Sequence, residues 1–161
     1  MKSHPIALGS EDSTVSRHAF LESEAAFNAF FESWTRGTLP KPAWTHAAHV
    51  AAAARIVFDV GPEAAFERMK AGILHHNNSV GTPNTEDSGY HETLTRFWCG
   101  TVASFVRGGR FASRLEAVRA AVSRFGEDRS RHKSFYSFDV VNDRRARREW
   151  IPPDRRPGLD A

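Results

Sequence analysis

The chain has one cysteine, Cys99, among its 161 residues, so it cannot form an intrachain disulfide. This excludes the small secreted folds that disulfides hold together. The sequence also lacks a run of about 18 apolar residues, which a membrane-spanning helix requires, and its N-terminus lacks the unbroken apolar segment of a secretory signal peptide. We therefore expect a cytoplasmic protein with no membrane partner.

Convincing strand patterns and internal repeats are missing as well. Apolar residues recur instead at spacings of three, four and seven, which indicate amphipathic helices. Five such segments, followed by one or two short helices, predict an all-α, single-domain bundle of five to six helices. The expected helices span about residues 16–36, 44–60, 62–78, 90–106 and 113–126.

The ends of the chain differ in composition from this helical part. Polar residues with Pro5 and Gly9 predict a flexible N-terminal arm over residues 1–15. Prolines at 152, 153 and 157 predict an extended C-terminal tail over residues 152–161, which leaves residues 16–151 as the helical domain. Nothing in the sequence indicates an oligomeric state.

The sequence is basic, with a formal net charge of +3 and many arginines between Arg144 and Arg156. Such a stretch can bind nucleic acid or an acidic partner, but it can equally form a solvated helix and tail. The arginines lack the interleaved aromatic residues of single-strand binders and match no DNA-recognition motif. We therefore expect no specific nucleic-acid partner.

The motif Trp44-Thr45-His46-Ala47-Ala48-His49 opens the second expected helix. His46 and His49 are three positions apart, so their side chains share one helical face and can converge on one point. Small apolar residues around them predict a buried or half-buried pair. The pair can bind a metal ion, or it can have a structural role in which the rings donate to loop backbone.

A second cluster, Tyr90-His91-Glu92, follows a long polar loop over residues 77–89 and opens the fourth expected helix. Long ordered loops are disproportionately functional. His91 shares a helical face with Thr95, while Glu92 shares another with Arg96. Glu92 and Arg96 can therefore also form a purely structural ion pair.

Together the two clusters predict a site at one end of the bundle, because an up-down-up course of the helices brings both motifs together. We expect His46, His49 and His91 to bind a divalent transition metal, which could be zinc, iron or manganese. Glu92, Tyr90 and Asn84 are the expected catalytic residues: Glu92 would be a fourth ligand or the general base, and Asn84 would supply an amide to the substrate unless it only forms a turn. A metal-free pocket with His91 and Glu92 as acid and base is the alternative.

Three segments resemble motifs of an uncharacterised family of small bacterial helical proteins with WTHxxH and GYHETxTR sequences; they are Trp44–His49, Gly81–Thr85 and Gly89–Trp98. Phe135–Ser137 and Arg148–Pro157 are similar to the C-terminal end of that family. The resemblance implies a bacterial cytoplasmic protein and no established activity. The chain departs from the family at residues 137–142, where a more basic stretch is expected.

The favoured functional hypothesis is a metal-dependent enzyme of the hydrolase type that acts on a small molecule. A metal ion would lower the pKa of bound water toward ~7 and so supply a nucleophile. The second hypothesis is a non-catalytic binding module for a small-molecule or nucleic-acid partner, with structural histidines. Metal content and salt-dependent nucleic-acid binding distinguish the two hypotheses.

Overall fold

The computed structural model describes residues 14–15 and 17–155, and all regular structure in that part of the chain is helical. This confirms the predicted all-α bundle. In chain order the elements are η1 (Ala19–Leu21), α2 (Glu24–Thr35), η2 (Lys41–Ala43), α3 (His46–Val60), α4 (Pro62–Ser79), α5 (Glu92–Gly108), α6 (Arg114–Phe125), η3 (Arg131–Ser134) and α7 (Arg144–Arg148), where η marks a short 3₁₀ helix. Residues 1–13 of the predicted arm and 156–161 of the predicted tail lie outside the described residues.

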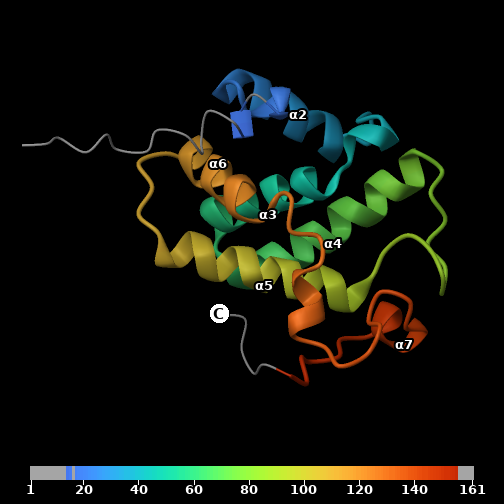
Figure 1. Cartoon of the computed structure of the whole chain (residues 1–161). Helices are drawn as coiled ribbons and strands as arrows, with labels where there is room; N and C mark the ends of the chain where they lie inside the picture. The colour runs from blue at the N-terminus through green and yellow to red at the C-terminus, as the bar shows by residue number, and fades with distance from the viewer. Residues whose placement is uncertain (1–13, 16, 156–161) are drawn as a thin grey trace, which may run out of the picture.

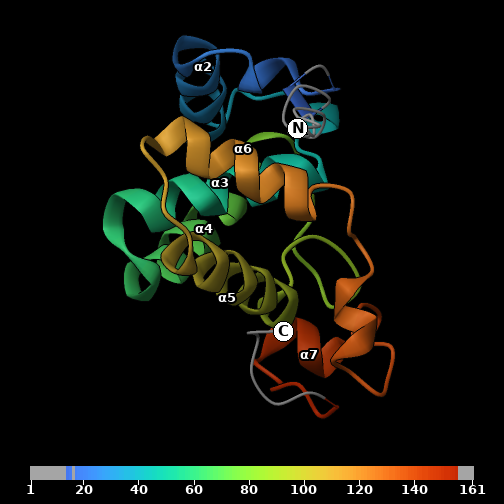
Figure 2. The same cartoon turned by 60° about the vertical axis from the view of Figure 1, so that its left-hand side comes forward.

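Helix α3 is the centre of the bundle and packs against α4, α5 and α6. Four consecutive alanines, Ala51–Ala54, are all buried on it. A methyl side chain lets neighbouring helices approach closely on every side, so a helix of this composition can be surrounded. Helix α2 lies at one end of the molecule and α7 at the opposite end (Figures 1 and 2).

The first predicted helix is shorter than expected. A helix over residues 16–36 was predicted, but α2 begins only at Glu24, and Ser16 lies outside the described residues. Ser23 has extended backbone angles, and its hydroxyl accepts a hydrogen bond from the amide of Ala26 at 3.0 Å. An N-cap serine of this kind starts a helix and separates it from the chain before it.

The later helix boundaries lie close to those predicted. Thr45 caps α3, with its hydroxyl 3.2 Å from the amide of Ala48. Ser113 caps α6, since its hydroxyl accepts from the amide of Glu116 at 3.1 Å, which is one half of a capping box. In a complete capping box the glutamate would also accept from the amide of the capping serine. Here Glu116 accepts from the amide of Ala112 instead of that of Ser113.

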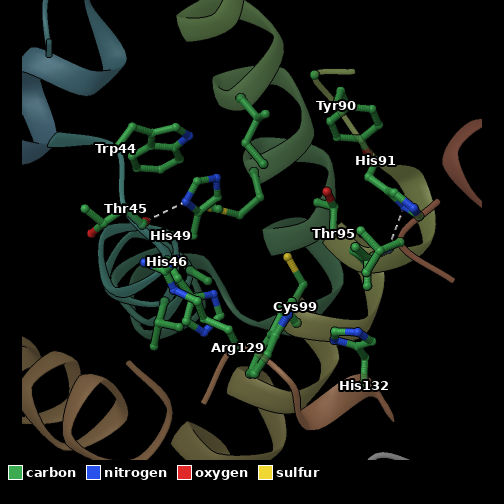
Figure 3. Close-up of a pocket in the computed structure, with 18 residues that line it drawn as sticks. Trp44, Thr45, His46, His49, Tyr90, His91, Thr95, Cys99, Arg129 and His132 are labelled. Carbon is green, nitrogen blue, oxygen red and sulfur yellow. Dashed lines mark hydrogen bonds between the residues drawn. The ribbon is translucent and has the colours of Figure 1, made fainter. Parts of the chain in front are cut away.

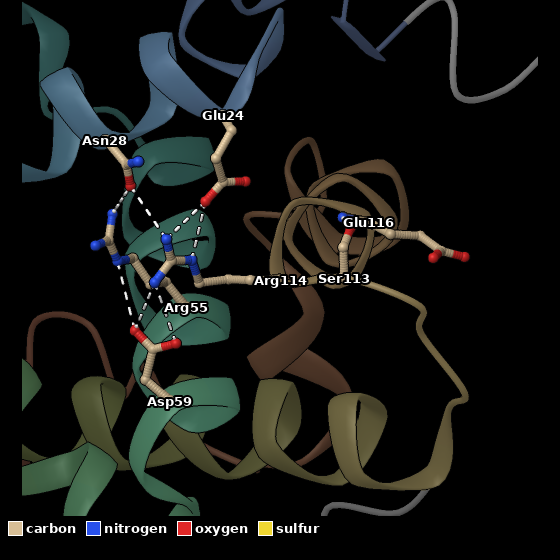
Figure 4. Close-up of polar contacts among 7 residues, drawn as sticks. All are labelled: Glu24, Asn28, Arg55, Asp59, Ser113, Arg114 and Glu116. Atoms are coloured by element: carbon tan, nitrogen blue, oxygen red, sulfur yellow. Dashed lines mark hydrogen bonds and ion pairs between the residues drawn. The ribbon is translucent and has the colours of Figure 1, made fainter.

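A polar network fastens α2 and α6 to α3 (Figure 4). Arg114 of α6 donates to Glu24 of α2 at 2.6 Å and to Asp59 of α3 at 3.3 Å. Arg55 of α3 donates to Asn28 of α2 at 2.9 Å, and its guanidinium lies 4.0 Å from the centre of the Phe31 ring. The three helices are thereby held in one arrangement, although α6 lies far from α2 and α3 in sequence. No helix in the described part of the chain is long and apolar enough to cross a membrane.

Candidate functional site

A cavity of about 440 Å³ lies between the first turns of α3 and α5 and the middle of α4, and the chain after α6 closes one side of it. Its volume is within the range of small-molecule sites, about 300–1,000 Å³. Figure 3 shows the lining, which is mainly apolar and aromatic. The cavity is lined by Trp44, Thr45, His46, His49, Val50, Ala53, Met69, Ile73, Gly89, Tyr90, His91, Leu94, Thr95, Trp98, Cys99, Arg129, His132 and Val141.

His49 is held in one orientation by the start of its own helix. Its Nδ1 lies 2.7 Å from the carbonyl oxygen of Thr45, and the ring of Trp44 packs against it at a tilt of 34°, with 3.9 Å between centroids. Because a carbonyl can only accept, Nδ1 carries the proton and Nε2 keeps a lone pair. Burial lowers the pKa of His49 to about 4, so the ring is neutral at pH 7.

His46 is fixed in the opposite tautomer by a distant part of the chain. Its Nε2 donates to the carbonyl of Phe125, the last residue of α6, at 3.0 Å, and its ring packs edge-on against Trp98. Nδ1 is therefore the nitrogen with a lone pair. Burial lowers the pKa of His46, while the carbonyl of Phe125 opposes that shift.

His91 uses both of its ring nitrogens within the protein. It is the N-cap of α5, where its Nδ1 accepts from the amide of Leu94 at 3.2 Å. Its Nε2 donates to the carbonyl of Val140 at 2.9 Å. Neither nitrogen is left for a metal ion in this arrangement, although the ring lines the cavity. Its role here is to join the start of α5 to the C-terminal segment.

Glu92 is not among the residues that line the cavity, and its carboxylate is surrounded by polar partners. Lys70 of α4 donates to its carboxylate at 3.0 Å and Arg96 at 3.3 Å, and the hydroxyl of Tyr90 donates at 2.8 Å. Burial alone would raise the pKa of Glu92, but the bonds from Lys70 and Tyr90 lower it, so the carboxylate stays charged. Tyr90 itself lines the cavity, and its pKa is raised by burial and by Glu92.

Asn84 organises the loop rather than the cavity. Its side-chain oxygen accepts from the amide of Tyr90 at 3.0 Å and from Asn77 at 2.9 Å. Gly89 has φ +79°, and an added Cβ would lie 2.4 Å from the carbonyl oxygen of Pro83, so only glycine fits this turn. Arg147 of α7 donates to the carbonyl of Gly89 at 3.0 Å and so attaches the loop to the C-terminal segment.

The structure thus brings together four of the six predicted site residues at one cavity, namely His46, His49, Tyr90 and His91. Glu92 and Asn84 lie outside its lining. Among residues 14–15 and 17–155, no three His, Cys, Asp or Glu side chains are grouped so that they could hold a metal ion. The metal site remains a prediction. His46 and His49 each keep one ring nitrogen with a lone pair that a metal ion could use.

Three of the lining residues with ionisable side chains were not among the predicted site residues: Arg129, His132 and Cys99. His132 and Arg129 come from the chain after α6, and no sequence motif connects that segment to the histidine clusters. Cys99 is buried, and burial raises the pKa of its thiol to about 12. Its sulfur is therefore a neutral thiol that adds to the apolar wall.

Comparisons of the chain with models of known protein families, with curated proteins and with solved structures found no match.

Proposed function

We propose that the protein is an enzyme that binds a small, largely apolar molecule in this cavity and acts on it through His46 and His49. One observation carries the proposal: two neutral imidazoles, each with one ring nitrogen occupied by a backbone carbonyl, lie in the wall of an apolar cavity. The remaining nitrogen of each ring can accept a hydrogen bond or a proton from a bound molecule or from water beside it.

The two rings are suited to different tasks. Burial lowers the pKa of both rings, to about 4 at His49. At His46 the carbonyl of Phe125, together with Asp128 and Glu127, opposes the lowering by burial and by Arg129, whereas no acidic side chain opposes it at His49. The more basic His46 is therefore the better proton acceptor at neutral pH, which general-base catalysis favours. His49, with a pKa of about 4, is a poor base but a good hydrogen-bond acceptor that can orient a substrate hydroxyl or amide. Activation of water by His46 corresponds to a reaction of the hydrolase type.

The cavity is tested with N-phenyl-1-naphthylamine, a neutral fluorophore whose emission rises in apolar surroundings. We expect saturable binding of one dye per chain. Ala53→Leu adds volume inside the cavity and should weaken binding at least tenfold, whereas Ala64→Leu, on an exposed position of α4, should not. Equal binding by all three proteins, each checked for unchanged helix content, would place the dye elsewhere and refute the cavity as the site.

The reaction is tested with a panel of 4-nitrophenyl esters and phosphates. His46→Gln should lower any kcat by about a hundredfold or more, the usual contribution of a general base. His49→Gln should mainly raise KM, because it removes an orienting contact. A hydrolytic activity that survives both substitutions would rule out the histidine mechanism.

A metal-dependent form of the same site is the second candidate. Histidines that bind metals almost always donate their other ring N–H to a carbonyl or a carboxylate, as His46 and His49 do here. With two protein ligands the remaining coordination positions would be filled by water or substrate. Protein purified without a His-tag is titrated with zinc, iron(II) and manganese, and bound metal is counted by elemental analysis. Uptake near one ion per chain that is lost in His46→Gln and in His49→Gln would support this form, and no uptake would refute it.

A further inference from the structure

Arg129 is the one side chain, among the described residues that line the cavity, that is charged at neutral pH. It follows α6 in sequence and is exposed, so its guanidinium lies at the rim of the cavity rather than in its floor. Figure 3 shows it on the same side of the cavity as His46. Burial is the main cause of the lowered pKa of His46, and the charge of Arg129 lowers it further, so the two groups are within electrostatic reach.

The guanidinium of Arg129 has no hydrogen bond or ion pair with another described side chain. The two acidic residues before it in sequence have other partners: Glu127 pairs with His18 at 3.8 Å, and Asp128 pairs with Arg131 at 4.0 Å. By contrast, Arg144 and Arg148 of α7 are each bound to carboxylates of the loop before α5. The donors of Arg129 are therefore available to a bound molecule.

We infer that the ligand of this cavity is an organic anion, with its apolar body between Trp44, Met69 and Trp98 and its acidic group on Arg129. This inference rests on the proposed function, because it names the substrate class of the same cavity. A planar guanidinium binds carboxylate, sulfonate and phosphate oxygens through paired N–H donors. A hydrated inorganic anion has no apolar surface to bury against these walls, so it would gain little from the same site.

Two dyes of nearly equal shape separate the charge from the apolar contacts. 8-Anilinonaphthalene-1-sulfonate carries a sulfonate, and N-phenyl-1-naphthylamine is its neutral counterpart. In Arg129→Gln the affinity for the sulfonate should fall about tenfold at low salt, as expected for loss of a charge-assisted hydrogen bond. The affinity for the neutral dye should stay the same. Arg129→Lys keeps the charge but loses the paired N–H donors. Its affinity for the sulfonate should therefore lie between those of wild type and Arg129→Gln.

Arg124→Gln is the matched control, because Arg124 is an exposed arginine five positions earlier that does not line the cavity. It removes the same charge and should leave both affinities unchanged. Equal loss in Arg124→Gln and Arg129→Gln would mean a general charge effect and would overturn the inference. Binding of the neutral dye with no preference for the sulfonate in wild-type protein would also overturn it, while the cavity itself would stand. If neither dye binds wild-type protein, the proposed function and the inference both fail.

Discussion

Tyr90 and Glu92 are two positions apart, and the hydroxyl of Tyr90 donates to the carboxylate of Glu92 at 2.8 Å, yet only Tyr90 lines the cavity. The chain changes from loop to helix between them, at His91. This change directs His91 toward Val140 and Glu92 toward Lys70 of α4. Three adjacent residues therefore contact three different parts of the structure: Tyr90 the cavity, His91 the C-terminal segment and Glu92 helix α4.

Glu92→Gln should destabilise the protein without affecting binding in the cavity. The substitution removes a buried negative charge and leaves Lys70 and Arg96 without their partner. Both cations are partly exposed to solvent, so we expect a loss of about 1–2 kcal/mol in the free energy of unfolding rather than the larger cost of a fully buried pair. Urea denaturation measures the loss. Glu67→Gln, on an exposed position of α4, is the control and should change little.

His91→Ala should lower the free energy of unfolding more than His91→Asn does. Alanine removes both the N-cap of α5 and the hydrogen bond to Val140, whereas asparagine can still cap the helix. We expect about 2 kcal/mol for His91→Ala and about half of that for His91→Asn. Hydrogen exchange near residues 138–142 should rise in both variants, because both lose the contact with Val140. Unchanged exchange there would contradict the proposed link between α5 and the C-terminal segment.

The stability of the protein should fall as the pH drops from about 6.5 to about 4, in part because of His49. The pKa of this ring is lowered from 6.5 to about 4 by burial, so the unfolded chain takes up a proton in that range and the folded chain does not. The contribution of His49 to the free energy of unfolding is fully present above the pKa of the unfolded chain. It is lost as the pH falls below that value, and the loss reaches about 3 kcal/mol. Denaturation curves between pH 7 and pH 4 should show a smaller decline for His49→Gln than for wild type. An identical decline would mean that His49 is not buried as a neutral ring.

Arg147→Gln and Arg144→Gln should differ, although both residues lie in α7. Arg147 donates to the carbonyls of Gly89 and Val141, so its loss leaves backbone acceptors unpaired and should cost about 1–2 kcal/mol. Arg144 pairs with Asp87 at the surface, with both side chains well exposed, and its loss should change the melting temperature little. Thermal denaturation of the two variants makes the comparison. Equal effects would contradict the structural role given to Arg147.

The arginine-rich segment should bind duplex DNA only weakly and with a steep dependence on salt. Arg144 is already paired with Asp87 and Arg148 with Glu86, which reduces the charge they offer to phosphates. Contacts to phosphates alone are sequence-independent and are screened by salt. Fluorescence anisotropy with two unrelated duplexes, at a series of salt concentrations that includes about 150 mM, would measure both the affinity and its salt dependence. Nanomolar affinity for one duplex and not the other would contradict the prediction.

The sequence by itself determined the helices and most of their ends, because these depend on residues three or four positions apart. The caps at Thr45 and Ser113 and the break at Gly61 are interactions of this local kind. The spacing of His46 and His49 likewise predicted that both rings would share a face, and both line the cavity.

Only the tertiary structure decided which of the predicted site residues still have a polar atom available to a ligand. His46 is fixed by a carbonyl 79 positions away, and His91 by one 49 positions away. Glu92 is held by Lys70, 22 positions before it. Helical periodicity places a side chain on a face but does not specify which distant backbone or charge that face will meet. The free nitrogens of His46 and His49, and the arginine beside them, follow from how α6 and the chain after it pack across the start of α3.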